Sequence, residues 1–101
     1  MGQRYHKVLY EASAAGAGDW VKLDGKFEEI AHRALQGTVA SGDTIGIEAT
    51  TVEKVEDITP VDIVELEEFD DDFAKVLVGN WTYVRAVKTG TNGVAKVQGY
   101  L

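Results

Sequence analysis

The densest group of side chains that could do chemistry in this sequence is an acidic stretch between residues 65 and 72. Leu66 and Phe69 interrupt it, so it does not read as a disordered acidic tail. Clustered carboxylates can hold a calcium ion, but the run 70–72 lacks the spaced oxygens and the glycine of an EF-hand loop. The sequence favours a solvated acidic turn and leaves a cation site as the open alternative. The acids are Glu65, Glu67, Glu68, Asp70, Asp71 and Asp72.

The other residues that catalysis commonly uses do not form a recognisable group. His6 and His32 are far apart and have no ligand spacing around them, and neither Ser13 nor Ser41 lies in a nucleophile elbow. The absence of cysteine excludes a thiolate nucleophile, a thiolate metal site and a disulfide scaffold. Nothing distinguishes any two of the 17 acids as a glycosidase pair. We therefore expect no catalysis, no metal and no cofactor, and a small carboxylate hydrolase is the least favoured alternative.

Three side chains could bind a partner or serve the fold. Arg85 lies between apolar neighbours on a predicted strand, where an arginine more often spans the strand face and pairs with an acid. Trp20 and Trp81 could stack on a sugar, but their large apolar area favours core packing. The predicted core includes Trp20, Ile45, Ile47, Trp81 and Val84.

Length and charge limit the classes of partner. The chain has 101 residues, enough for one domain without disulfides or metals. Its formal charge is −7, from ten basic and 17 acidic residues. Because nucleic-acid binders neutralise phosphates with basic side chains, direct binding to DNA or RNA is not expected. No apolar run approaches the ~20 residues of a membrane span, so we expect no membrane contact.

Alternation of apolar and polar residues predicts a series of short strands. Residues 44–51 are the clearest, because Ile45 and Ile47 alternate with polar or small residues. Further strands are predicted at residues 4–11, 20–23, 61–69 and 73–78.

The end of the sequence reads as one β-hairpin. Its two strands, residues 81–87 and 94–100, are rich in β-branched and aromatic residues. Asn92-Gly93 lies between them, and both residue types tolerate the positive φ of tight hairpin turns.

Residues 27–36 carry two conflicting signals. Apolar residues recur there at helical spacing, with Glu28 and Glu29 near the start and Arg33 near the end, which suits a helix dipole, and Gly37 could cap it. Turn signals on both sides, and the strands around them, favour a strand instead. We expect a strand and keep the helix as the alternative.

About seven short strands with turn signals every eight to twelve residues predict an all-β protein. The expected fold is an antiparallel, jelly-roll-like β-sandwich with at most one short helix. Residues 19–101 would form the sandwich domain. Residues 1–18 would be either an N-terminal arm or the first strand, followed by a Gly/Ala-rich connector.

Several phrases resemble small β-sandwich virion proteins of tailed bacteriophages. Asp-Trp-Val-Lys-Leu-Asp-Gly-Lys-Phe begins at Asp19, Gly-Asp-Thr-Ile-Gly-Ile-Glu-Ala at Gly42, and Gly-Asn-Trp-Thr-Tyr-Val-Arg-Ala-Val-Lys-Thr-Gly-Thr at Gly79. In that group a phrase of the type aromatic-x-Tyr-Val-Arg-x-x-x-Thr-Gly commonly precedes the last strand, which matches Trp81 to Gly90. The resemblance covers residues 19–101 and concerns structure rather than catalysis.

The resemblance implies a strand that ends in a turn at Leu35-Gln36-Gly37, and it implies a function. The expected protein is a non-enzymatic phage virion component, best a capsid decoration (cement) protein that stabilises the shell. The alternatives are a tail or fibre-associated module and a glycan-binding module. The expected partners are the major capsid protein or another virion protein, and further copies of this chain, as a trimer. The expected location is the virion, assembled in the host cytoplasm.

The N-terminal segment is the predicted contact region. It carries a small basic cluster on an otherwise acidic protein, together with apolar side chains, and the Gly/Ala-rich residues 14–18 would let it leave the body as an arm. An ordinary first strand of the sandwich is the alternative. The predicted partner-binding residues are Arg4, Tyr5, Lys7, Leu9 and Tyr10.

Overall fold

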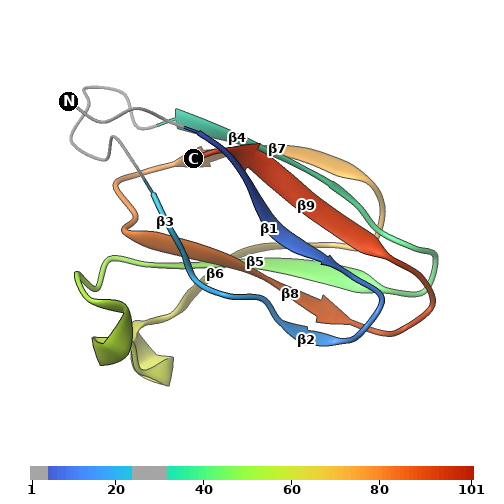
Figure 1. Ribbon diagram of the computed structural model, residues 1–101, viewed down its shortest axis with the longest axis horizontal. Coiled ribbons are helices and arrows are strands. Elements are labelled where there is room, and N and C mark those ends of the chain that lie inside the picture. Colours follow the sequence, from blue (N-terminus) through green and yellow to red (C-terminus); the bar gives the residue numbers. More distant parts are fainter. Residues whose placement is uncertain (1–4, 24–31) are drawn as a thin grey trace.

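Two antiparallel sheets face each other in the computed structural model, which describes residues 5–23 and 32–101 (Figure 1). The strand order of sheet A is β1 (His6–Ala12), β9 (Ala95–Tyr100), β4 (His32–Thr38) and β7 (Phe73–Val78). That of sheet B is β2 (Gly16–Ala17), β8 (Tyr83–Thr89), β5 (Thr44–Thr50) and β6 (Val64–Phe69), and β3 (Val21–Lys22) also pairs with β8. The described residues contain no α-helix, only two 3-10 turns, η1 (Val55–Asp57) and η2 (Pro60–Asp62). The predicted all-β sandwich is confirmed.

The chain changes sheet at almost every connection. If β2 and β3 are taken as two pieces of one interrupted strand, each sheet has four strands, and only β5 and β6 are consecutive strands of the same sheet. Eight strands in two four-stranded sheets with these crossings form a jelly roll. Side chains that are distant in sequence therefore meet at both ends of the sandwich.

The predicted hairpin at the end of the sequence is wrong. β8 lies in sheet B beside β5, whereas β9 lies in sheet A between β1 and β4, so the loop between them crosses the sandwich. No described residue other than glycine has a positive φ, so Asn92 does not form the expected turn. The backbone N–H groups of Asn92 and Gly93 instead donate to the carboxylate of Asp43, at 3.1 and 3.2 Å. Alternation had indicated two strands correctly, but it carries no information on which strands pair.

The core fills the space between the sheets with alternate residues of each strand. Ile45 and Ile47 of β5 and Val84 of β8 are fully buried. Trp81 precedes β8 and is partly buried against this cluster. Its indole Nε1 donates to the carbonyl of Val78 at 3.0 Å, which satisfies its one polar atom.

The prediction that Trp20 belongs to the core is wrong. Val21 lies opposite Val84 and shares its inward direction, so Trp20, immediately before β3, is directed to the other side. The Trp20 ring lies on the outer face of sheet B, with the guanidinium of Arg85 4.4 Å from its centre. A cation over an indole face is a favourable contact, which gives this tryptophan a structural role outside the core.

The described part of the ambiguous segment is a strand. Residues 32–38 form β4, while residues 27–31 lie outside the described residues. β4 does not turn at Leu35-Gln36-Gly37, as the resemblance implied, but runs on to Thr38 with Gly37 opposite Phe73. A Cβ at Gly37 would lie 2.4 Å from the Phe73 ring, so this glycine makes room for a ring rather than for a turn.

The described part of the N-terminal segment is a strand of the sandwich and not an arm. β1 pairs with β9 from His6, opposite Tyr100, to Ala12, opposite Ala95. A β-bulge lies between Val8 and Tyr10, where the pairing register shifts. The described residues from 5 onward therefore belong to the sandwich, and the connector after β1 contributes β2 to sheet B.

Candidate interaction surface

The most distinctive surface of the molecule is the outer face of sheet A, the side that points away from sheet B. Among the residues that the structure describes, its one ion pair joins Glu11 and Lys96 at 3.7 Å, at one end of the face. Val76, Val78 and Tyr100 are 54%, 62% and 63% exposed on it. In the register of the four strands, its described residues are His6, Val8, Glu11, Ala34, Gln36, Thr38, Ala74, Val76, Val78, Lys96, Gln98 and Tyr100.

Small side chains hollow the middle of this face. Two shallow depressions of about 270 and 300 Å³ lie side by side over β4 and share Gln36, Ala74 and Gln98 in their linings. His6 borders the first of them, where its Nε2 donates to Gln98 Oε1 at 2.8 Å and its ring packs edge-on against Tyr100. The face thus offers neutral amides, small apolar groups and an aromatic pair to a partner.

The outer face of sheet B has the opposite character, because it carries several charges. Arg85 lies in its middle, stacked on Trp20, and donates to Glu48 at 2.8 Å. The predicted pairing of Arg85 with an acid is therefore confirmed. In the strand register, Glu65 and Glu68 of β6 lie on this face as well. Within the described strands, the outer face of sheet B thus carries more acids than the outer face of sheet A, where Glu11 lies.

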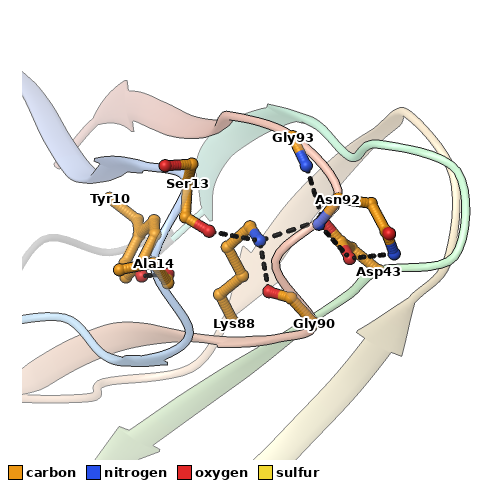
Figure 2. A network of polar contacts seen from close by, with 8 residues as sticks. All are labelled: Tyr10, Ser13, Ala14, Asp43, Lys88, Gly90, Asn92 and Gly93. Atoms are coloured by element: carbon orange, nitrogen blue, oxygen red, sulfur yellow. Dashed lines mark hydrogen bonds and ion pairs between the residues drawn. The ribbon is translucent and has the colours of Figure 1, made fainter.

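A buried polar network ties three loops together at the end of the sandwich where β8 finishes (Figure 2). Lys88 and Asp43 form an ion pair at 2.9 Å, and both side chains have no exposed surface. The ammonium also donates to the carbonyls of Ser13 and Gly90. The Asp43 carboxylate accepts from the backbone of Asn92 and from its side-chain amide, at 2.8 Å for the latter.

This network lowers the pKa of Asp43 from its ordinary value of 3.8 to about 2. The main cause is the hydrogen bond from Lys88, to which Asn92 and the Gly93 backbone add, while burial opposes them. Gly90 and Asp43 are in such close contact that a Cβ on Gly90 would lie 2.2 Å from Asp43 Oδ1. With its partners already supplied by the protein, the ion pair serves the fold and not a ligand.

Two carboxylates of the acidic turn between β6 and β7 accept hydrogen bonds from nearby backbone N–H groups. Asp72 Oδ1 accepts from the backbone of Val39 at 2.9 Å, and Asp71 Oδ1 accepts from the backbone of Asp72 at 2.8 Å. A polar hollow of about 630 Å³ opens beside this turn, lined partly by Ser41, Asp70 and Asp71. Among the described residues, no three His, Asp or Glu side chains gather closely enough to hold a metal ion.

The predicted partner-binding residues that the structure describes differ in burial. Leu9 is only 4% exposed and belongs to the core, and Tyr10 packs against that core with its hydroxyl donating to the carbonyl of Ala14. Leu9 is thus a core residue and Tyr10 a partly buried one, because β1 is paired with β9 as a strand of the sandwich. Tyr5 is 56% exposed, and Lys7 donates to the carbonyl of Lys22 at 2.8 Å. Arg4 lies outside the described residues.

Sequence reasoning missed two basic side chains that are buried in the described part of the chain. Lys88 continues the inward alternation of Val84 and Ala86, which was the available signal that it is buried. Arg33 is 1% exposed on the inner side of β4, opposite Leu77, although its position had suggested the end of a helix. The outer face of sheet A was also missed, because it needs the pairing of strands that are far apart in sequence.

Comparison of the chain with protein-family models, with curated proteins and with solved structures gives no match in any of the three. Within residues 5–23 and 32–101, no helix is long and apolar enough to cross a lipid bilayer.

Proposed function

We propose that this protein is a non-enzymatic structural component of a phage virion, and most specifically a capsid decoration protein that docks on the shell through the outer face of sheet A. The observation that carries the proposal is the contrast between this face and the rest of the molecule. A protein with a formal charge of −7 keeps a four-stranded face on which the described residues form a single ion pair and leave Val76, Val78 and Tyr100 exposed. Surfaces poor in charge and rich in aromatic and apolar groups are typical of protein contacts.

Two further points support the proposal. The phrases beginning at Asp19, Gly42 and Gly79 resemble those of small virion proteins of tailed phages. Jelly rolls recur in viral shells, although they also occur in lectins and enzymes, so the fold alone does not select a function. The partner in this proposal is the major capsid protein, and the site of action is the assembled virion.

A glycan-binding module is the main alternative, and the surroundings of the two tryptophans do not favour it. The guanidinium of Arg85 covers the Trp20 ring at 4.4 Å, and Trp81 packs against the core. Glycan binding of the kind considered for this sequence requires an exposed aromatic platform.

The test uses two matched double variants. Gln36 and Gln98 are opposite each other in the middle of the outer face of sheet A, and Thr44 and Thr89 are opposite each other on the outer face of sheet B. Gln36→Glu with Gln98→Glu, and Thr44→Glu with Thr89→Glu, each add two acids to one cross-strand pair. Co-sedimentation with shells that lack the protein measures binding.

Wild type and the sheet B variant should bind shells saturably, and the sheet A variant should lose binding by about tenfold or more, since two buried charges would lack partners. Equal binding by both variants would show that the outer face of sheet A is not the contact. Binding of wild type to tail or fibre proteins, but not to shells, would assign it to another part of the virion.

A further inference from the structure

The four edges of the sandwich differ in how they discourage pairing with another strand. An edge strand presents unpaired backbone N–H and C=O groups, and proteins commonly protect it with a bulge, with charge or by keeping it short. β1 has a bulge between Val8 and Tyr10, and β2 and β3 are two residues long. β6 has three glutamates among its six residues and a register shift against β5.

β7 is the exception among the described edges. It has six residues and pairs with β4 without a register shift, from Gly37 opposite Phe73 to His32 opposite Val78. It contains no proline and no acid, and Val76 and Val78 are more than half exposed. Its far side has no strand partner within the described part of the chain.

The single charge of β7 is already compensated. Lysine on an edge strand commonly discourages pairing. Here Lys75 donates to Glu67 of β6 at 2.8 Å, across the gap between the two sheets. The adjacent rings of Phe69 and Phe73 stack at 3.9 Å and close the same gap. The Lys75 side chain therefore points toward β6, and it does not place an unpaired charge along the free backbone edge of β7.

We infer that β7 pairs with β7 of a second copy of this chain, antiparallel and about a two-fold axis at Val76, so that the two sheets A join into one. In this register Val76 lies opposite Val76 of the second copy, Ala74 opposite Val78, and Lys75 opposite Leu77. All opposed side chains share a face, as sheet pairing requires, and no like charges lie directly opposite each other. Asp72 comes opposite Asn80, which keeps the acidic turns of the two copies apart.

The inferred contact closes at two copies, because each copy uses the same strand and the contact is its own complement. It therefore replaces the trimer that the resemblance implied. It also joins the outer faces of the two sheets A into one continuous surface. The pairing rests on the β7 edge alone, and it stands whether or not the protein binds a capsid.

The chain contains no cysteine, so single cysteines can report the register directly. Opposed residues of an antiparallel pair have Cα atoms about 4.5–5.5 Å apart, which suits a disulfide. Val76→Cys should form a covalent dimer on mild oxidation. Ala74→Cys and Val78→Cys should each form no covalent dimer alone and should cross-link when mixed. In this register, residue 74 of one copy is four residues, or about 13 Å, along the strands from residue 74 of the second copy.

Sedimentation velocity of the full chain gives the second measurement. Wild type should form a concentration-dependent dimer, twice the 11.0 kDa chain mass, that strengthens with salt because salt screens the acids of neighbouring β6 strands. Val76→Lys would place two ammonium groups on the axis and should raise the dimer dissociation constant about tenfold or more. Val94→Lys is the matched control, since Val94 is 60% exposed and lies in the loop before β9.

Three results would overturn the inference. The first is a monomer at all concentrations, and the second is a trimer. The third is a dimer that Val76→Lys leaves intact and Gln36→Lys disrupts, which would mean that copies pack face to face through sheet A. Circular dichroism of each variant, compared with wild type, separates loss of pairing from loss of folding.

Discussion

Asp43 and Lys88 are fully buried, yet the chain keeps both charged. A carboxylate or ammonium group is costly to bury unless its partner and its remaining hydrogen bonds are in place. Here the carboxylate has Lys88, Asn92 and Gly93 around it, and the ammonium has two further carbonyl acceptors. The pair thus fixes the β4–β5 turn, the β1–β2 loop and the β8–β9 loop relative to one another.

This arrangement predicts how stability depends on pH. The pKa of Asp43 is about 2 in the folded protein, below its ordinary value of 3.8, so its contribution is complete above about pH 4 and is lost as the pH falls toward 2. Asp43→Asn removes this contribution and leaves Lys88 buried without its counter-charge. The melting temperature of the variant should therefore fall furthest below that of wild type near pH 7, and the difference should shrink between pH 4 and pH 2.

Thermal melts followed by circular dichroism from pH 2 to 7 measure this difference. Asp70→Asn, at an exposed acid of the neighbouring turn, is the control and should leave the melting curves nearly unchanged. A difference between wild type and Asp43→Asn that stays constant over the whole pH range would contradict the assigned pKa.

At the scale of elements, the close approach of β9 to β4 depends on a glycine. Gly99 lies opposite Leu35, and a Cβ there would be 2.2 Å from the backbone carbonyl oxygen of Ala34. Gly37 in β4 is also buried, but a Cβ there would meet the far end of the Phe73 side chain, which can move. A methyl group at position 99 would therefore have to displace backbone, whereas one at position 37 would have to displace only a side chain.

Gly99→Ala should lower the free energy of unfolding by about 3 kcal/mol or more, because backbone must shift, and Gly37→Ala by about 1 kcal/mol. Urea unfolding at equal m-values gives both numbers. Equal losses for the two variants would mean that β4 and β9 can separate without cost.

The strands could be predicted from sequence better than their partners. The predicted strand 73–78 is β7 without change, and 44–51 differs from β5 by one residue. Alternation in Ile45, Gly46 and Ile47 fixes which side of a strand is buried, because a core face needs every second residue. It does not say which strand lies beside it, so β8 and β9 were paired wrongly.

The composition of the outer sheet faces could not be predicted from the sequence either, because it depends on which strands pair. Gln36 and Gln98 come from strands about sixty residues apart, and their meeting on one face follows only from the jelly-roll order. Trp20 was misplaced because a tryptophan is usually assigned to the core by its size, whereas Arg85 supplies a partner on the outer face. The composition did indicate the acidity, but not that the described residues of one face include a single acid, Glu11.

At the scale of the whole molecule, the N-terminal strand is part of one cooperative unit. β1 covers one side of β9, and Leu9 fills the core between the sheets. The backbone N–H of Leu101 also donates to the carbonyl of Tyr5 at 3.0 Å, and Leu101 is fully buried. The two ends of the described chain thus support each other.

Deletion of residues 1–15 should therefore abolish cooperative folding rather than detach an arm. It exposes β9 on one side, removes Leu9 and takes away Ser13, an acceptor of Lys88. Circular dichroism and thermal melts of the truncated chain give the answer. A truncated protein that melts cooperatively and has lost only particle binding would restore the idea of an N-terminal arm.

The position of β9 also governs how the chain can acquire its structure. β9 is the last strand along this sequence, yet it lies between the first and the fourth, and β8 likewise joins strands made much earlier. Sheet B cannot be completed on the ribosome before β8 has emerged, nor sheet A before β9 has emerged. Such long-range pairing slows folding, typically to milliseconds or seconds for sandwiches of this kind. During that interval β1 and β4 have no strand between them, and their apolar sides are open to aggregation.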